Sequence, residues 1–177
     1  MPIYTRKGDR GKTSLFDKKK VWKYDLKVEA YGTVDELNST IGAASAFVSI
    51  KKINLELEEI QNDLLEIGSS LAVSKTLSAK QLSKRPEEFE KLIDELTIQM
   101  PKLSKFILPG GGRAGSFLQL ARTVSRRAER KVVHLSRKEP VDQIILIYLN
   151  RLSDLLFTMA RFVNFKEKQK EQIWRKK

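Results

Sequence analysis

Residues 144–163 read IILIYLNRLSDLLFTMARFV, and this stretch is the clearest indication of the fold class. Its apolar residues recur every three or four positions, which is the spacing of one face of an α-helix, and the stretch is too long for a strand. The pattern predicts a helix that begins near Pro140. Its inward face carries Ile144, Ile145, Tyr148, Leu149, Leu152, Leu155, Leu156, Met159 and Val163.

Four more segments upstream show the same periodicity, at about 27–49, 53–73, 86–100 and 114–137. Thr33 and Glu36 resemble a capping box, which leaves open where the first of these helices begins. Prolines and consecutive glycines interrupt the pattern at 101–115. Five amphipathic helices with little strand signal predict an all-α, five-helix bundle that forms a single domain over residues 1–177.

The amino-acid composition argues against several classes of functional site and indicates the charge of the partners. The chain has 177 residues, no cysteine and a single histidine, His134, which argues against disulfides, thiolate metal sites and multi-histidine metal sites. It shows no apolar run long enough for a membrane span and no apolar leader segment, so we expect a cytoplasmic protein. The net charge of +12 favours anionic partners, and the basic residues 166–177 are expected to be a solvated helix end or a disordered extension.

The N-terminal stretch KGDRGKTSL, residues 7–15, ends as a P-loop ends. The P-loop pattern would place its first glycine at position 6, but that residue is Arg6, and the nearby glycine is Gly8. Too few residues precede the stretch for a buried parallel strand. The sequence therefore argues against a P-loop.

The same stretch still has the composition of an anion-binding loop, because glycines let backbone N–H groups turn inward and the flanking side chains supply charge and hydroxyl donors. The alternative is a frayed basic terminus. The residues concerned are Thr5, Arg6, Lys7, Gly8, Arg10, Gly11, Lys12, Thr13 and Ser14.

The predicted fourth helix carries a polar face formed by Arg122, Arg126, Glu129 and Arg130, at positions i, i+4, i+7 and i+8. Arginines oriented by a carboxylate suit a polyphosphate, because the planar guanidinium binds phosphate oxygens in pairs. The alternative is a solvated basic face with intrahelical salt bridges. The nearby basic loop favours the phosphate interpretation.

Two other helices place polar residues in an apolar context. Asn150 and Asp154 lie one turn apart in the fifth helix, and an asparagine there suits the edge of an adenine or a ribose, or fixes helix register. The first helix offers Asp35, Glu36 and Asn38. A buried carboxylate needs a cationic partner, and the fourth-helix arginines are the candidates.

Five segments, in this order, resemble the PduO-type ATP:cob(I)alamin adenosyltransferases. The resemblance implies a ferritin-like five-helix bundle that forms a homotrimer with active sites between neighbouring subunits. The segments are YTRKGDRGKTSL at 4–15, EAYGTVDELNSTIG at 29–42, FILPGG at 106–111, ARTVSRRAERKVV at 121–133 and YLNRLSDLLFTMAR at 148–161.

The resemblance also implies the chemistry. The cobalt of reduced cobalamin attacks the 5′-carbon of ATP, and triphosphate leaves, with Mg²⁺ accompanying the nucleotide. The cobalt is the nucleophile, so the protein supplies position and charge and needs no catalytic Ser, Cys or His. The family further implies a corrinoid reductase and an adenosylcobalamin-dependent enzyme as partners.

The resemblance assigns site residues by their matching motifs. The N-terminal loop, residues 1–25, would cover the ATP, and Arg126, Phe106, Asp35 and Arg122 would act in catalysis. The ATP set is Thr5, Arg6, Lys7, Gly8, Thr13, Ser14, Lys23, Arg126, Arg127, Ala128, Glu129, Arg130 and Asn150. The corrin set is Phe106, Asp35 and Arg122, with no metal ligands of the protein's own.

In the family, the aspartate of one subunit pairs with the arginine of the next, and the phenylalanine displaces the lower ligand of cobalt. By burial frequencies alone, Phe106 would be a core residue. Lys7, Lys12 and Arg113 depart from the usual family pattern.

Two other functions are compatible with parts of the sequence. A basic helical protein that binds nucleic acid or an anionic surface would show salt-sensitive affinity spread over many lysines, and it would not need Glu129 or Asn150. A trimeric carrier that delivers adenosylcobalamin to a dependent enzyme is compatible with the transferase. The ordered motifs favour the transferase, and we expect neither nucleic acid nor a membrane as its main partner.

Overall fold

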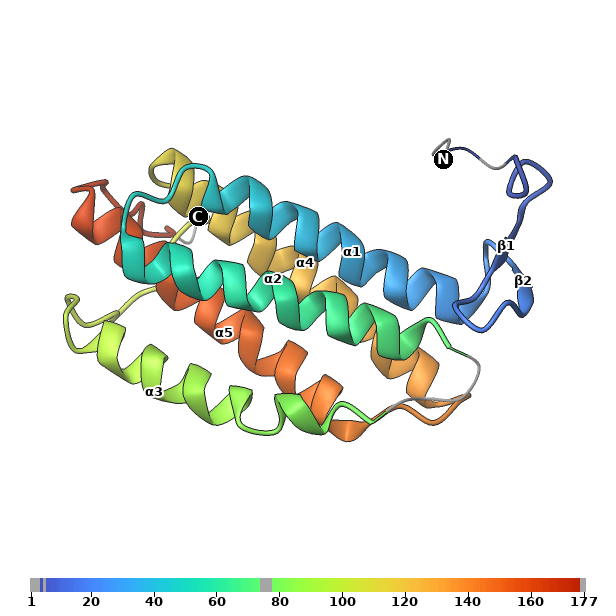
Figure 1. The fold of residues 1–177 in the computed structure, drawn as a ribbon. Coiled ribbons are helices and arrows are strands. Elements are labelled where there is room, and N and C mark those ends of the chain that lie inside the picture. The colour runs from blue at the N-terminus through green and yellow to red at the C-terminus, as the bar shows by residue number, and fades with distance from the viewer. Residues whose placement is uncertain (1–3, 5, 74–77, 176–177) are drawn as a thin grey trace.

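Five α-helices account for most of the computed structural model, which describes residue 4, residues 6–73 and residues 78–175 (Figure 1). A two-stranded hairpin precedes the helices, and a short 3₁₀ helix, η1, precedes α3. The bounds are β1 Lys12–Ser14, β2 Lys20–Trp22, α1 Leu26–Ser45, α2 Lys51–Leu71, η1 Lys80–Leu82, α3 Arg85–Thr97, α4 Arg113–Ser136 and α5 Gln143–Lys166.

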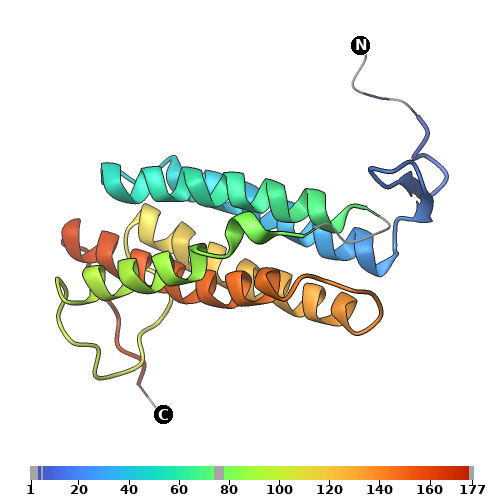
Figure 2. The same ribbon diagram turned by 60° about the horizontal axis from the view of Figure 1, so that its bottom comes forward.

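The helices pack side by side along one long axis, and α1, α4 and α5 form the centre of the bundle. Helix α4 contacts both α1 and α5, while α2 packs on α1 and the shorter α3 packs on α5 (Figure 2). Each helix contributes buried apolar side chains to one continuous core. The predicted all-α, five-helix bundle is confirmed.

Aspartates cap the N-termini of α1 and α5. Asp25 accepts a hydrogen bond from the amide of Lys27 (2.9 Å), so α1 begins at Leu26 rather than at the capping box proposed around Thr33. Asp142 caps α5 in the same way, which moves the start of that helix from the predicted Pro140 to Gln143. A side chain that satisfies the free amides of the first turn fixes where a helix begins.

The hairpin was not predicted, because three-residue strands are too short to show an alternating pattern. Strands β1 and β2 pair antiparallel, with Lys12 opposite Trp22, Thr13 opposite Val21 and Ser14 opposite Lys20. The expected N-terminal loop therefore contains regular structure.

The segment after α5 folds back onto the segment between α3 and α4. The amide of Leu108 donates to the carbonyl of Gln172 and the amide of Trp174 donates to the carbonyl of Phe106, both at 2.8 Å. Arg161 of α5 is buried and forms an ion pair with Glu171 (3.1 Å). Part of the segment predicted as a solvated or disordered extension is thus paired and folded.

The cap of α5 makes stability depend on pH. The Asp142 carboxylate accepts hydrogen bonds from the amides of Ala79 (2.9 Å) and Ile144 (3.1 Å), and from the hydroxyl of Ser78 (3.3 Å). These bonds, that from Ala79 above all, lower the pKa of Asp142 below its usual 3.8. A lowered pKa in the folded state means that the stabilisation is present above about pH 3.8 and is lost as the pH falls through the folded value.

We therefore expect Asp142→Ala to lower the free energy of unfolding by about 1 kcal/mol at neutral pH. The difference from the wild type should shrink below pH 3.8, as measured by urea unfolding at a series of pH values. Asp94→Ala, which removes an exposed carboxylate from α3, serves as the control. A pH-independent difference for Asp142→Ala would contradict the argument.

Candidate functional site

The predicted arginine face lies on α4, which packs along both α1 and α5. Arg126 and Arg130 are exposed, and Arg127 forms an ion pair with Glu36 of α1. Ala128 is fully buried against the core, so within this motif it supports the helix and leaves the polar contacts to its neighbours. The exposed guanidinium groups are available to an anionic ligand, because arginine offers several donors in one plane.

Glu129 and Asn150 meet between α4 and α5. The side-chain amide of Asn150 donates to the Glu129 carboxylate at 3.0 Å. This contact uses one N–H of the amide and leaves its carbonyl oxygen to accept a bond from a ligand. Glu129 was expected to orient the arginines, but its hydrogen bond in the described part of the chain goes to Asn150. Asn150 thus lies directly beside the arginine face of α4.

The hairpin brings together the glycines and Lys23 of the predicted phosphate loop. The amide of Lys23 donates to the carbonyl of Gly11 (2.9 Å), and Gly11 has a φ of 75°, which favours glycine. A Cβ on Gly8 would lie 3.3 Å from the Lys23 ammonium nitrogen, so this ammonium lies over the Gly8 backbone. Gly8 and Lys23, both assigned to ATP by the resemblance, thus lie side by side.

The other loop residues differ in their surroundings. Arg6, Lys7 and Ser14 are exposed and Thr13 is half-buried, whereas Thr5 lies outside the described residues. The Lys12 ammonium lies 4.6 Å from the centre of the Trp22 ring, a cation–π contact. Lys12 thus packs on the neighbouring strand.

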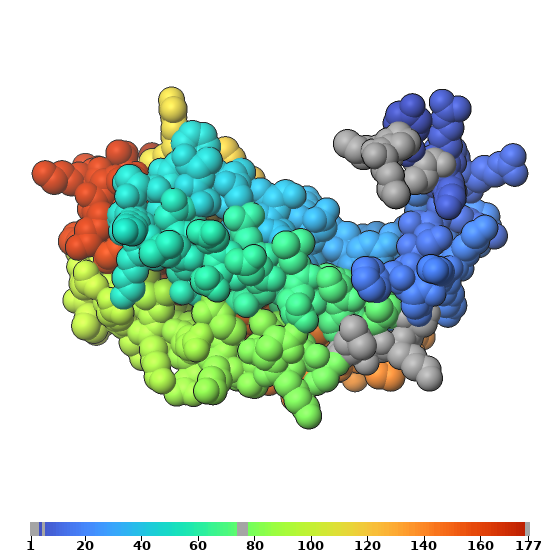
Figure 3. Space-filling model, viewed as in Figure 1, coloured from blue at the N-terminus to red at the C-terminus, as the bar shows by residue number. Residues whose placement is uncertain are grey.

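Within a single chain, the N-terminal hairpin does not lie against the arginine face of α4. Figures 1 and 3 show β1 and β2 standing out beyond the N-terminal end of α1, outside the bundle. Among the described residues, no hydrogen bond or ion pair joins 6–14 to 126–130. The two halves of the predicted ATP site are therefore separate in a single copy.

No hydrogen bond or ion pair joins the predicted corrin residues to one another in the part of the chain that the structure describes. Asp35 is exposed on α1, contrary to the expected burial, while Arg122 is half-buried and donates to the buried Gln119 at 2.8 Å. Burial lowers the pKa of Arg122, and the positive charge of Arg126 lowers it further. In the part of the chain that the structure describes, neither Asp35 nor Arg122 has an ion-pair partner. The carboxylate and the guanidinium thus remain available to a second molecule.

Asp35 lies in a groove of about 310 Å³ between α1 and α2. Gly32 and Gly68 face open space, and the Oδ1 atom of the buried Asn38 has no hydrogen-bond partner among the described residues. The groove is lined by Phe16, Tyr31, Gly32, Asp35, Asn38, Leu64, Leu65, Gly68, Ser69 and Ala72. These features favour close approach of another surface here.

Phe106 belongs to the segment between α3 and α4. Figures 1 and 2 show this segment at the end of the bundle opposite the hairpin. The Phe106 side chain is 80% exposed, so it is not the core residue that burial frequencies would suggest. The ring of Trp174 meets it edge-on, with 6.4 Å between ring centres. An exposed apolar ring on a segment that backbone hydrogen bonds hold in place suits contact with a ligand.

Asn164 of α5 holds this segment, a role that the sequence analysis missed. Its Oδ1 accepts from the amide of Gly112 (3.0 Å), and its Nδ2 donates to the carbonyl of Gly110 (2.9 Å). A Cβ on Gly111 would lie 2.3 Å from this side chain, and one on Gly115 would lie 2.1 Å from it. The glycines therefore make room for Asn164. The only signal in the sequence is one asparagine at the end of an apolar helix.

We expect Gly115→Ala to destabilise the protein by about 1–3 kcal/mol, because the methyl group would overlap Asn164, which two hydrogen bonds hold in place. Urea unfolding measures the change. Gly68→Ala is the matched control: its methyl group enters open space inside a helix, so we expect equal or greater stability than in the wild type. Equal effects of the two substitutions would contradict the role of Asn164.

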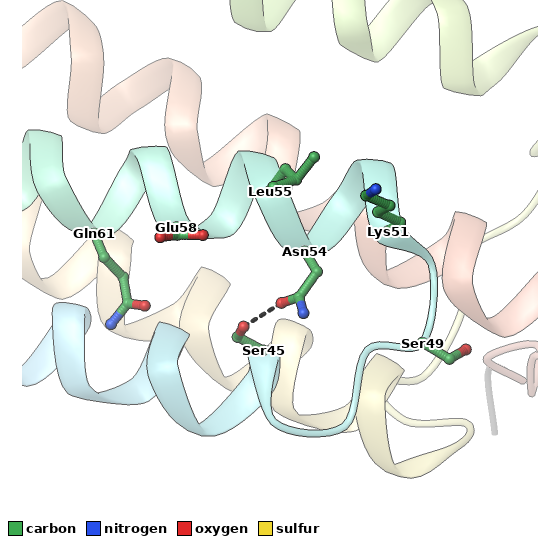
Figure 4. A pocket seen from close by; sticks show the side chains of 7 residues that line it. All are labelled: Ser45, Ser49, Lys51, Asn54, Leu55, Glu58 and Gln61. Carbon is green, nitrogen blue, oxygen red and sulfur yellow. Dashed lines mark hydrogen bonds between the residues drawn. The ribbon is translucent and has the colours of Figure 1, made fainter.

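Another hollow lies elsewhere, between α1 and α2 (Figure 4). It measures about 520 Å³, and Ser45 donates a hydrogen bond to Asn54 inside it. None of the predicted site residues lines it; the lining is Ser45, Ser49, Lys51, Asn54, Leu55, Glu58 and Gln61. Its size alone does not make it the functional site, because the predicted phosphate ligands lie on other elements.

Two observations limit the other classes of site. Within the described ranges, no group of three or more His, Cys, Asp or Glu side chains could hold a metal ion. No helix among the described residues is both long and apolar enough to span a bilayer. His134 is exposed in the last turn of α4.

Comparisons with known proteins agree with the motifs. Residues 3–163 match the family model described as cobalamin adenosyltransferase. The chain is 44% identical over 169 residues to the corrinoid adenosyltransferase of Bacillus subtilis, covering 93% of this chain and 87% of that protein. It is 42% identical over 183 residues to the human corrinoid adenosyltransferase MMAB, covering 98% of this chain and 73% of that protein.

A solved structure is similar over nearly the whole chain. It is a variant of the PduO-type ATP:corrinoid adenosyltransferase from Lactobacillus reuteri, complexed with cobalamin and ATP. The TM-score is 0.92 at 39% sequence identity, covering 99% of this chain and 100% of that chain.

Proposed function

The chain belongs to the cobalamin adenosyltransferase family, and from this premise we propose that it transfers the 5′-deoxyadenosyl group of ATP to cobalamin in the Co(I) state. The cobalt of the substrate supplies both electrons of the new Co–C bond. The C5′–O bond breaks, and inorganic triphosphate leaves with the bonding electrons. The products are adenosylcobalamin and triphosphate.

The protein's part in this reaction is electrostatic and geometric. Triphosphate gains negative charge as it leaves, and donors already in place stabilise that charge better than water, which must reorganise. Arg126 and Arg130 offer such donors on α4, and Gly8 and Lys23 offer them on the hairpin. Mg²⁺ would enter with the nucleotide phosphates.

The observation that carries the proposal is the hydrogen bond from Asn150 to Glu129. It fixes an amide whose remaining acceptor suits an adenine amino group or a ribose hydroxyl, directly beside a row of arginines that suits phosphates. A protein that merely binds nucleic acid through its lysines would not need this pairing.

We propose a homotrimer, because one chain separates residues that the reaction needs together. A neighbouring copy would place its hairpin over the arginine face of α4 and its Asp35 against Arg122. Asp35 and Arg122 both lack an ion-pair partner among the described residues. Closed cyclic assemblies form from heterologous contacts of this kind. A corrinoid reductase and an enzyme that uses adenosylcobalamin would be further partners.

The exposed ring of Phe106 is proposed to displace the lower ligand of cobalt. An apolar ring cannot ligate the metal, and it excludes groups that can. Cobalt without that ligand is easier to reduce to Co(I). The 80% exposure of the side chain in one chain agrees with a role in contact with substrate.

The visible spectrum of cob(II)alamin tests the function. The purified protein is mixed anaerobically with ATP, Mg²⁺ and a strong reductant. Light-sensitive adenosylcobalamin should appear only when both protein and ATP are present, and Phe106→Ala should slow it more when cob(II)alamin must be reduced than when cob(I)alamin is supplied. No product under fully reduced conditions would refute the transferase proposal.

A further inference from the structure

The N-terminal hairpin touches the bundle at few points, although its position decides where Gly8, Thr13, Ser14 and Lys23 lie. In the turn between its two strands, the amide of Phe16 donates to the carbonyl of Ala72, just after α2 (2.9 Å). The hairpin then returns, and the chain enters α1 at Leu26. Contacts that hold the chain where it enters α1 therefore also hold the hairpin in position.

Lys27 makes contacts where the chain leaves the hairpin and enters α1. It lies in the first turn of α1, is only 5% exposed, and its Nζ donates to the carbonyl of Val73 at 2.9 Å. The same Nζ forms an ion pair with Glu139, in the segment between α4 and α5, at 2.8 Å. One buried ammonium thus joins three segments that are distant in sequence.

The turn of the hairpin and its exit into α1 are therefore held by neighbouring carbonyls, those of Ala72 and Val73. Between these anchors, the backbone runs through the turn, β2 and Lys23, and β1 is held to β2 by strand pairing. The Lys23 amide is bonded to Gly11, so movement at either anchor shifts the glycines as well.

A lysine is an unfavourable residue for the buried first turn of a helix if its only role is to pack against its neighbours. The N-terminus of a helix carries a partial positive charge, which opposes an ammonium there. Burying an ammonium also costs desolvation energy, and well-packed apolar residues commonly replace buried ion pairs without loss of stability. The position of Lys27 therefore points to a role other than maximal stability.

We propose that Lys27 is a positioning residue for the ATP phosphates: it fastens the hairpin to the end of α2 and so sets the place of Gly8, Thr13, Ser14 and Lys23. Lys27 does not itself touch ATP in this proposal, which rests on the proposed function of the hairpin. Its effect reaches the nucleotide through the backbone.

Lys27→Met tests the proposal, because methionine keeps much of the side-chain volume and removes the donors. Amide hydrogen exchange, read without ATP, should be at least tenfold faster within 11–23 than in the wild type, while the core amides of α4 and α5 keep their protection. Lys27→Arg should restore protection. Lys52→Met removes a different interhelical ion pair, that with Glu95, and should leave 11–23 unchanged.

Steady-state kinetics distinguish a role in positioning the ATP site from a general role in folding. Lys27→Met should raise KM for ATP about tenfold or more, with KM for cobalamin unchanged, and Lys27→Arg should lower KM for ATP again. Wild-type exchange in 11–23, or exchange accelerated equally throughout the core, would overturn the proposal. So would equal shifts of both KM values. Because exchange needs no turnover, failure of the transferase assay in the wild type would refute the proposed function and leave this test intact.

Discussion

Arg126→Ala is expected to lower kcat for adenosyl transfer about 10²- to 10³-fold, the usual cost of removing one preorganised donor from a site where charge develops. Arg126 is exposed on α4, one turn from Glu129 and beside Arg122. Its guanidinium can therefore bind the leaving triphosphate without first giving up a described ion pair. The effect should be greater on kcat than on KM for cobalamin.

Steady-state kinetics against ATP and against cob(I)alamin measure this effect. Arg126→Lys keeps the charge and loses the planar fork, so an intermediate rate is expected. Lys138→Ala removes an exposed positive charge after the end of α4 and controls for net charge. If Arg126→Ala retained wild-type kcat, or if Lys138→Ala matched its loss, the assignment of Arg126 would be wrong.

The second large effect is expected at the boundary between subunits of the proposed trimer. Asp35→Ala or Arg122→Ala should weaken each interface by about 3–5 kcal/mol, the usual cost of leaving one member of a desolvated pair alone. Gln119 holds Arg122 in place, and Asp35 is exposed for a partner. We therefore expect both variants to dissociate at protein concentrations where the wild type stays assembled, and to use cobalamin poorly.

Sedimentation velocity across a range of concentrations measures the assembly. The double variant Asp35→Arg with Arg122→Asp restores opposite charges across an interface and should recover part of the assembly, which two unrelated losses would not do. Glu59→Ala removes an exposed carboxylate from α2 as the control. Normal assembly and normal cobalamin use in both single variants would refute the pairing.

The sequence predicted the helices well where periodicity was long and unbroken. Helix α5 was expected from near Pro140 and begins at Gln143, because Asp142 supplies the cap. The hairpin escaped prediction, since strands of three residues show no periodicity. The folded C-terminal segment escaped it too, because its order comes from pairing with residues 106–108, which lie far away in sequence.

The sequence names candidate site residues, but it does not show how they are arranged. Motif order makes Asn150 and Glu129 candidates, whereas their mutual hydrogen bond depends on how α4 and α5 pack. Asn164 could not be assigned, because its role appears only when the glycine-rich segment is folded against it. Asp35 was expected to be buried and is exposed in one chain. Burial at an interface leaves the same apolar pattern in sequence as burial within a chain.

The pairing of Phe106 and Leu108 with residues 172–174 has a consequence for local unfolding. The contacts that hold this segment span more than 50 residues, as Gly112 to Asn164 does, yet few of them lie in the core. Such peripheral, long-range contacts open together at a lower free energy than central helices. The segment bearing Phe106 and the residues 172–174 that pair with it should therefore form one foldon, which would let the proposed corrinoid substrate enter and leave while the five helices stay folded.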